Sequence, residues 1–317
     1  MKAEEVGLKG KEVLNEVKKA IVGKDRVLKL VLTTILADGH VLIEDLPGLA
    51  KTLMAKSFAG ALGMRFTRVQ FTPDLLPSDI LGVSVFNQKT LEFEFRKGPV
   101  FTNVLLADEI NRAPPKTQSA LLEAMQERQV TIEGTTYSLP RPFVVIATQN
   151  PIEQEGTYPL PEAQLDRFLV RLRVGYPDRG EELEILRRRM NRKKEEVDLR
   201  AVTTPEEVLE MQRAIEEVYV SDAILEYITD IVATTRNDRK EIDVGASPRG
   251  SLALLKLSRA YAALGGRDYV IPDDVKAVAV PALSHRLILK RELWYTKVSQ
   301  DSIMEKLLDR VPVPKFE

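Results

Sequence analysis

One segment of this 317-residue chain has the residue types and spacing that bind phosphate groups. Residues 45–52 read Asp-Leu-Pro-Gly-Leu-Ala-Lys-Thr and lie between an apolar run and a helical pattern. A turn between a strand and a helix presents backbone N–H groups and the positive end of the helix to an anion. Lys51 could reach the outer phosphates of a nucleotide, and the Thr52 hydroxyl could ligate Mg²⁺. The segment therefore predicts a phosphate loop.

Two positions of this loop depart from the general phosphate-loop pattern, which has glycine where Asp45 and Ala50 stand. Aspartate tolerates left-handed backbone better than most residues, but its charge opposes a nearby anion. We therefore predict that Asp45 weakens nucleotide binding without abolishing it. Ala50 is the milder change and requires only that its φ be negative.

A second segment supplies paired carboxylates. The apolar run over residues 104–107 ends in Asp108 and Glu109. Asp108 could hold Mg²⁺ through water, and Glu109 could orient and deprotonate an attacking water. Many strands end in a solvated acidic turn, so the pattern gains weight only from the predicted phosphate loop that precedes it.

Three further polar residues could complete a phosphoryl-transfer site. Asn150 follows an apolar run and could hold the attacking water or contact the γ-phosphate. Arg167 ends a short helix, and Arg249 lies in the first turn of another, which Ser247 and Pro248 begin. An arginine near a transferring phosphoryl group stabilises the charge of the transition state. Taken singly, these residues are better explained by an Asn-Pro turn and two surface cations.

A parallel sheet would bring these residues together. Apolar runs suitable for strands occur at 40–43, 66–71, 104–107 and 143–148, and helical patterns occur at 8–36, with a break at Val22-Gly23-Lys24, and at 53–62. The last two strands are continuous enough to be buried on both faces. Two predicted hairpins, at 83–95 and 129–139, lack this continuity and are expected outside the sheet.

The pattern changes after Tyr176-Pro177. Strand-like runs largely disappear, and residues 180–310 read as helices separated by Pro, Gly and charged turns. We predict an α/β fold with an αβα nucleotide-binding core over 1–177 and a helical domain over 178–317. The basic block at 187–194 is flanked by acids, which favours a solvated helix over a nucleic-acid patch.

Composition excludes several classes of protein. Lys and Arg total 46 and Asp and Glu total 47, so the formal charge of −1 gives no general attraction to a polyanion. The chain has no cysteine and two distant histidines, which excludes disulfides, cysteine nucleophiles and histidine-rich metal motifs. No run approaches the roughly 18 apolar residues that span a bilayer. We expect a cytoplasmic protein with no membrane span.

Taken together, six segments are similar to the MoxR family of AAA+ ATPases over nearly the full chain. They are residues 43–52, 70–79, 108–116, 147–151, 161–168 and 245–249. The second, third and fifth are long enough to be specific to that family. The resemblance implies an AAA+ αβα parallel-sheet core with a C-terminal all-helical lid domain.

The resemblance also implies a role for each matching residue. Lys51 and Thr52 resemble the Walker A pair, and Asp108 and Glu109 resemble the Walker B pair. The remaining catalytic residues that it implies are Asn150 as sensor 1, Arg249 as sensor 2 and Arg167 as an arginine finger. The nucleotide contacts that it implies are Val22, Gly23, Pro47, Gly48, Leu49, Ala50, Lys51 and Thr52, with Thr52 and Asp108 at the metal.

An arginine finger acts on ATP bound by the neighbouring subunit, so the resemblance implies a homo-oligomeric ring, usually a hexamer. The hairpins at 82–98 and 129–139 resemble the helix 2 insert and the pre-sensor 1 hairpin, which point toward the pore of such rings. Phe86, Phe93 and Phe95 could contact a client there or pack the hairpin against the body. The implied function is Mg²⁺-dependent ATP hydrolysis that remodels or matures a client protein, with a von Willebrand factor A domain protein as partner.

Three alternatives remain at this point. A magnesium-chelatase-like subunit would share the same inserts. A nucleotide-gated scaffold with little turnover is suggested by Asp45, although the presence of Glu109, Asn150 and Arg167 argues against it. A DNA-acting motor would need a basic pore, whereas the hairpin at 129–139 has no Lys or Arg, so nucleic-acid binding is not expected.

Overall fold

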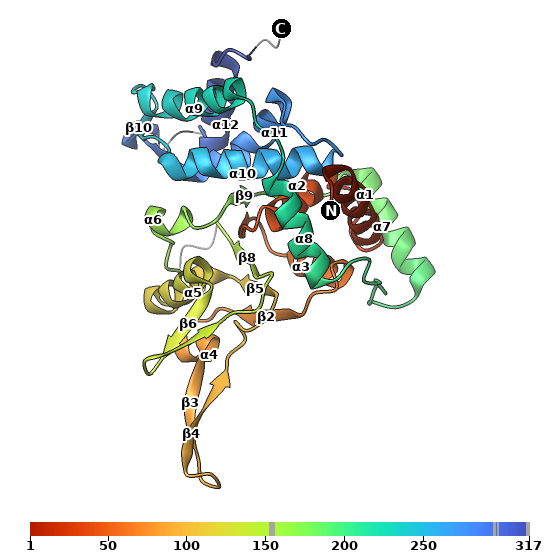
Figure 1. Cartoon of the computed structure of the whole chain (residues 1–317), viewed down its shortest axis with the longest axis vertical. Coiled ribbons are helices and arrows are strands. Elements are labelled where there is room, and N and C mark those ends of the chain that lie inside the picture. The colour runs from red at the N-terminus through yellow and green to blue at the C-terminus, as the bar shows by residue number, and fades with distance from the viewer. Residues whose placement is uncertain (152–155, 294–295, 297, 315–317) are drawn as a thin grey trace.

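The core of the molecule is a five-stranded parallel sheet, seen in a computed structural model that describes residues 1–151, 156–293, 296 and 298–314 (Figure 1). Its strands are β1 Val41–Glu44, β2 Phe66–Gln70, β5 Val104–Asp108, β8 Val144–Gln149 and β9 Val170–Leu172. Their order across the sheet is β2-β5-β8-β1-β9. The four predicted strands are present. The edge strand β9 was missed because it has only three residues, one of them Arg171.

Buried side chains alternate between the two faces of the sheet. In β1, Val41 and Ile43 join one hydrophobic cluster, and Leu42 joins the other. The same alternation places Leu106 and Leu105 of β5 in different clusters. Because helices cover both faces, residues 41–43 of β1 and 104–107 of β5 are all apolar. The prediction of strands buried on both faces is confirmed.

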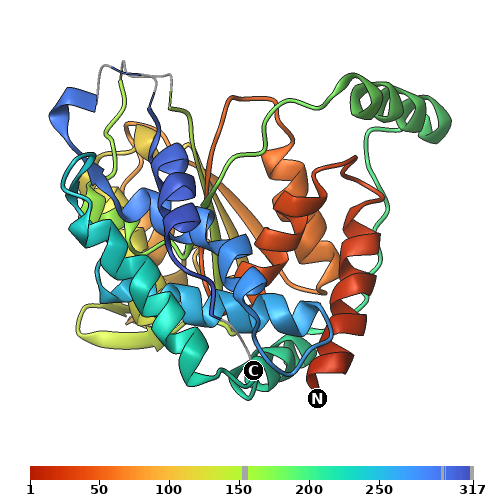
Figure 2. The ribbon, with the colours of Figure 1, turned by 90° about the horizontal axis from the view of Figure 1, so that it is seen from above.

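The first cluster packs beneath helices α1 Ala3–Val17, α2 Asp25–Leu36 and α3 Lys51–Ala61. Residues 18–24 separate α1 from α2 and include the predicted break at Val22-Gly23-Lys24, so the first helix ends four residues earlier than the pattern through Ile21 indicated. The opposite face carries α4 Pro77–Leu81 and α5 Pro115–Glu127, with a short helix α6 Glu162–Leu165 beyond them. The αβα layering is therefore confirmed (Figures 1 and 2).

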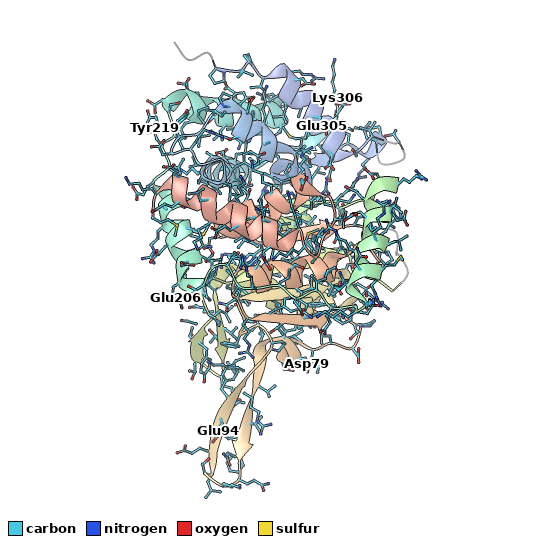
Figure 3. All side chains as sticks on the ribbon, turned by 90° about the vertical axis from the view of Figure 1, so that its right-hand side faces the viewer. Asp79, Glu94, Glu206, Tyr219, Glu305 and Lys306 are labelled. Carbon is cyan, nitrogen blue, oxygen red and sulfur yellow. The ribbon has the colours of Figure 1, made fainter. Side chains whose placement is uncertain are left out.

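Both predicted hairpins form and lie outside the main sheet. They are β3 Gly82–Asn87 with β4 Glu92–Lys97, and β6 Gln129–Ile132 with β7 Thr135–Ser138. Figures 1 and 3 show that β3 and β4 project from the body. Phe86 and Phe93 pair edge to face far along this hairpin and are 46% and 68% exposed. Phe95 instead stacks on Tyr137 of the other hairpin. The packing interpretation therefore applies to Phe95, and client contact by Phe86 and Phe93 stays a prediction.

The second half of the chain is largely helical, as predicted. Its elements are α7 Arg179–Arg192, α8 Pro205–Glu216, α9 Asp222–Asn237, α10 Pro248–Leu264, α11 Pro272–Leu283 and α12 Gln300–Arg310, with a small antiparallel pair, β10 Ile242–Val244 and β11 Ile288–Leu289, that the sequence did not indicate. Three-residue 3-10 helices lie at Ile110–Arg112, Ser284–Arg286 and Arg291–Leu293. No helix in the described ranges is long and apolar enough to cross a membrane.

These helices share a core with the first half. One hydrophobic cluster contains residues of α1, α2, α8, α10 and α11. Helix α1 lies so close to the end of α10 that a Cβ on Gly7 would be 2.8 Å from the Cα of Gly266. A domain boundary near residue 177 thus does not coincide with a break in the core, and it stays a prediction. Helix α7 differs from the others because it has no buried residue and lies at the side of the molecule (Figure 2).

Candidate functional site

The predicted phosphate loop connects β1 to α3, and its backbone is left-handed at two positions. Gly48 has a φ of 82° and Ala50 a φ of 56°. The expectation of a negative φ at Ala50 was therefore wrong, since Ala50 precedes the first residue of α3 in a conformation that only glycine adopts without steric cost. A Cβ on Gly48 would meet no heavy atom within 4 Å, so glycine serves the backbone there and leaves the loop open to a ligand.

The Asp45 carboxylate is bound by backbone donors. Its Oδ2 accepts N–H groups from Val174 and Gly175, both at 2.7 Å, and its Oδ1 accepts the N–H of Leu46 at 2.9 Å. The charge therefore ties the phosphate loop to the residues that follow β9. The carboxylate is held by these amides and is not among the residues that line the cavity described next, and its effect on nucleotide affinity stays a prediction.

The loop opens onto a polar cavity of about 440 Å³. It lies at the carboxyl ends of β1, β5 and β8, which adjoin in the sheet, so that residues from three distant segments meet there. The lining residues are Pro47, Gly48, Ala50, Lys51, Thr52, Leu53, Arg68, Gln70, Asp108, Glu109 and Asn150. The structure thus brings together Lys51, Thr52, Asp108, Glu109 and Asn150, as the sequence predicts.

The charged residues of this cavity are held by hydrogen bonds. Lys51 donates from Nζ to the backbone oxygen of Asp45 at 2.7 Å. Partial burial lowers the pKa of Lys51, and the nearby carboxylates of Asp45, Asp108 and Glu109 act in the opposite direction. Thr148 donates from Oγ1 to Asp108 Oδ1 at 2.6 Å and accepts the N–H of Glu109 at 2.8 Å. This threonine therefore positions both acids.

Two residues of β2 contact the acids, and sequence reasoning missed them. Arg68 donates to Asp108 Oδ2 from Nε at 3.0 Å and from Nη2 at 2.7 Å. Gln70 donates to Glu109 Oε2 at 2.6 Å, and Arg112 donates to the same oxygen at 3.0 Å. The signal was present in the alternation of β2, whose pairing with β5 sets Gln70 opposite Asp108 and puts Arg68 on the same side.

A second, mostly apolar cavity of about 150 Å³ adjoins the first through Gly48, Ala50 and Leu53. Its walls also include residues 20–22, Lys24, Val174, Gly175, Pro177 and Ile185 of α7. Val22 lines it as predicted. Gly23 belongs to the same turn but is not among the lining residues, and a Cβ there would overlap the side chain of Glu181. The α7 contribution was missed because charged residues dominate that helix.

The arrangement suits a ligand with an anionic end and a flat apolar end. Among the described residues, no group of three or more His, Cys, Asp or Glu could hold a metal by itself. A divalent ion could instead be shared between Thr52, Asp108 and the oxygens of an anionic ligand.

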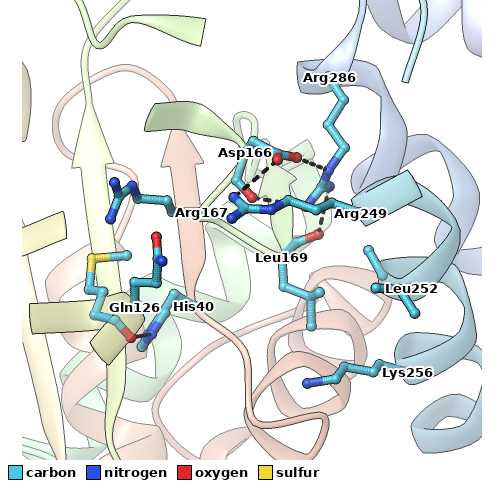
Figure 4. A pocket seen from close by; sticks show the side chains of 11 residues that line it. His40, Gln126, Asp166, Arg167, Leu169, Arg249, Leu252, Lys256 and Arg286 are labelled. Atoms are coloured by element: carbon cyan, nitrogen blue, oxygen red, sulfur yellow. Dashed lines mark hydrogen bonds and ion pairs between the residues drawn. The ribbon is translucent and has the colours of Figure 1, made fainter. Parts of the chain in front are cut away.

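The two predicted arginines lie in a different place. Arg167 and Arg249 line a cavity of about 250 Å³, shown in Figure 4, which shares no described lining residue with the phosphate cavity. Arg167 donates from Nη1 to the backbone oxygen of Leu122 at 2.8 Å. Arg249 donates from Nη1 to Asp166 Oδ2 at 3.4 Å. The helix start predicted at Arg249 is confirmed, with Ser247 as its N-cap.

The sheet explains this separation. The N–H of Leu169 donates to the backbone oxygen of His40 at 2.9 Å, just before β9 and β1 begin. Arg167 therefore lies near the amino ends of the strands, whereas Lys51 follows a carboxyl end. The four residues of β1 separate these edges by about 13 Å at roughly 3.3 Å per residue. The structure does not bring either arginine to the phosphate loop of its own chain.

Arg286 supports the segment that carries Arg167. Its side chain is 4% exposed and donates to Asp166 Oδ1 at 2.7 Å and to the backbone oxygen of Phe168 at 3.0 Å. Burial lowers the pKa of Arg286, and the Asp166 carboxylate acts in the opposite direction. Figure 4 shows Asp166 between Arg286 and Arg249. The sequence offered no sign of this contact.

Comparison with known proteins agrees with the geometry. Residues 40–170 match the family described as "ATPase family associated with various cellular activities (AAA)", and residues 235–307 match "AAA lid domain". "Chaperone MoxR1" of Mycobacterium tuberculosis is 45% identical over 95% of this chain and 81% of its own length. "Uncharacterized protein YeaC" of Bacillus subtilis is 50% identical over 97% and 95% of the two chains.

A solved structure is also similar. The crystal structure of a putative ATPase from Cytophaga hutchinsonii is 44% identical, has a TM-score of 0.91, and covers 99% of this chain and 97% of that one. The magnesium-chelatase alternative is more distant. "Magnesium-chelatase subunit ChlI homolog" of Methanocaldococcus jannaschii is 28% identical over 58% of this chain and 50% of its own length.

Proposed function

Because the chain belongs to the MoxR family of AAA+ ATPases, we propose that it hydrolyses ATP with Mg²⁺ in a homo-oligomeric ring and uses this reaction to remodel a client protein. The observation that carries the proposal is the convergence of Lys51, Thr52, Asp108, Glu109 and Asn150 on one polar cavity. The adjoining apolar cavity accommodates the adenine base, and the polar cavity accommodates the phosphates.

The residues of the polar cavity divide the chemistry between them. Backbone N–H groups at the start of α3 and the Lys51 ammonium bind the phosphates. Thr52 and Asp108 hold the Mg²⁺ ion, which neutralises charge on the phosphates when bound. Glu109 accepts a proton from the attacking water, and Asn150 orients that water. Glu109 must first release the hydrogen bonds that Gln70 and Arg112 donate to it.

Residues from a neighbouring copy complete the site. Arg167 and Arg249 lie at the sheet edge opposite the phosphate loop, so neither stabilises the transition state in its own chain. We assign both to the nucleotide of the next subunit, where a guanidinium stabilises developing negative charge. A closed ring, with six subunits as the working size, gives every site its pair of arginines.

The proposals about a client and a partner protein rest on other observations. A relative 45% identical is named a chaperone. The exposed pair Phe86 and Phe93 gives the projecting hairpin an apolar surface that suits contact with a client. A von Willebrand factor A domain protein as partner follows from the family resemblance alone. The scaffold alternative drew on the charge of Asp45, which backbone donors bind in this structure.

Phosphate release from Mg-ATP tests the proposal, measured over a range of protein concentrations for the native chain, Glu109→Gln and Arg167→Ala. Specific activity should rise with concentration, and each variant alone should lose most of it. Mixing the two variants should restore part of the activity, because Glu109→Gln subunits supply Arg167 to intact Glu109 sites. A native chain that binds ATP without turnover would favour the scaffold, and a mixture that stays inactive would contradict the shared site.

A further inference from the structure

The Asp108 carboxylate already has a cationic partner within its own chain. Two N–H groups of the Arg68 guanidinium, on Nε and Nη2, bind the same oxygen, Oδ2, at 3.0 and 2.7 Å. The other oxygen, Oδ1, accepts the hydroxyl of Thr148 at 2.6 Å. The carboxylate therefore meets a donor at each oxygen, and its Oδ2 faces a full positive charge.

Arg68 is placed to affect whatever binds in the polar cavity. It lines that cavity together with Lys51 and Thr52. Its Nη2 also donates to Gln70 Oε1 at 2.9 Å, which holds the guanidinium over the acids. The Arg68 side chain is 48% exposed, whereas that of Asp108 is 12% exposed. The arginine can therefore turn toward solvent, but the carboxylate is fixed.

A structural role alone does not explain this contact. Strand β2 pairs with β5 through five consecutive residue pairs, from Phe66 opposite Val104 to Gln70 opposite Asp108. The ladder holds the edge strand without help from a half-exposed ion pair, since such pairs contribute little to stability. The effect of Arg68 is instead electrostatic and local, because its charge lies on the carboxylate that the proposed function gives to the metal.

We infer that Arg68 and Mg²⁺ are alternative partners of Asp108, so that Arg68 determines how strongly nucleotide binding depends on Mg²⁺. The inference rests on the proposed function. Without the metal, Arg68 adds a second cation beside Lys51 and favours binding of free nucleotide. With the metal, the guanidinium repels it at the shared oxygen and must leave. Removing the arginine charge therefore has opposite effects in the two conditions.

ADP binding to the full chain, measured by calorimetry in excess EDTA and in excess MgCl₂, tests this inference without relying on turnover. In EDTA, Arg68→Gln should bind ADP roughly fivefold more weakly than the native chain, because a unit charge near a phosphate matters even at the dielectric of water. In MgCl₂, the variant should bind as tightly or more tightly. The ratio of the two dissociation constants should thus rise by at least about fivefold.

Arg65→Gln is the matched control, because it removes the same charge from the exposed residue that precedes the other end of β2. Its ratio should equal the native ratio. Arg68→Lys keeps the charge without the two-pronged contact and should show a smaller rise in the ratio. This variant also tests the inference if Arg68→Gln does not fold. An unchanged ratio in both Arg68 variants would overturn the inference alone. A native chain that binds no ADP in either condition would overturn the proposed function and the inference together.

Discussion

Replacing Asp45 tests whether the phosphate loop and the wall of the apolar cavity act as one unit. In Asp45→Ala, the N–H groups of Val174 and Gly175 lose the carboxylate oxygen that both reach at 2.7 Å. These two residues line the apolar cavity, and Gly48 and Ala50 of the loop line both cavities. The substitution therefore separates two walls that a nucleotide must contact at the same time.

The size of the effect follows from these bonds. A hydrogen bond to a charged group contributes about 1.5–3 kcal/mol net, and partial exposure of Asp45 favours the lower end. Two such bonds give about 3 kcal/mol of contact between the walls. A nucleotide that has to restore the lost order would lose between about 1.4 and 3 kcal/mol of binding free energy. This corresponds to an ADP dissociation constant roughly 10- to 100-fold higher.

Calorimetric titration with ADP measures this change, with Asp198→Ala as a control that removes an exposed acid far along the chain. Asp45→Asn keeps one acceptor oxygen without the charge and should fall between native and Asp45→Ala. The loss should be equal in EDTA and in MgCl₂, because Asp45 contacts neither Asp108 nor Arg68. Asp45→Ala or Asp45→Gly that binds ADP as tightly as the native chain would refute this reasoning.

Three other substitutions report on particular contacts. Ala50→Gly should raise the free energy of unfolding by about 0.5–1 kcal/mol in urea titration, since relief of the left-handed alanine exceeds the added entropy of the unfolded chain. A destabilised variant would contradict the φ of 56°. Burial lowers the pKa of His40 to about 3, so its contribution to stability is complete above about pH 6.5 and falls as the pH drops toward 3. His40→Gln should therefore reduce the slope of stability against pH in that window by up to about 1.4 kcal/mol per pH unit. An unchanged slope would exclude a neutral, buried His40 ring. Arg286→Met should lower the free energy of unfolding by about 3 kcal/mol or more, measured by thermal or urea unfolding, because it leaves Asp166 without its buried partner. A loss below about 1 kcal/mol would show that the pair is dispensable.

Most of the sheet could be predicted from the sequence because the buried parallel strands β1, β5 and β8 each contain a run of consecutive apolar residues. The convergence of Lys51, Asp108 and Asn150 could also be predicted, because each follows or ends a strand and parallel strands have their carboxyl ends at one edge of the sheet. Strand β9 escaped because Arg171 interrupts it, and the 10% exposed guanidinium is accommodated through ion pairs with Glu44 and Asp301. Those partners lie more than a hundred residues away from Arg171 in the sequence, where local pattern gives no information.

The features of the site that the sequence did not predict have a common physical cause. Arg68 belongs to a half-exposed edge strand, where polar residues usually face water. The direction of Asp45 depends on amides at positions 174 and 175, which a loop motif does not contain. The position of Arg249 depends on how α10 packs against the body, which a local motif does not contain.

The anchoring of α7 has a consequence for how fast nucleotide can leave. Ile185 gives this helix a share of the apolar cavity, yet Leu183, Leu186 and Met190 remain exposed and few contacts, such as the Lys24–Glu181 ion pair, hold it. A helix with so little buried surface opens at a free energy far below that of global unfolding. Amide hydrogen exchange should therefore be fast in α7 and slow when ADP is present. The opening rate of this one helix would then limit the rate at which ADP dissociates.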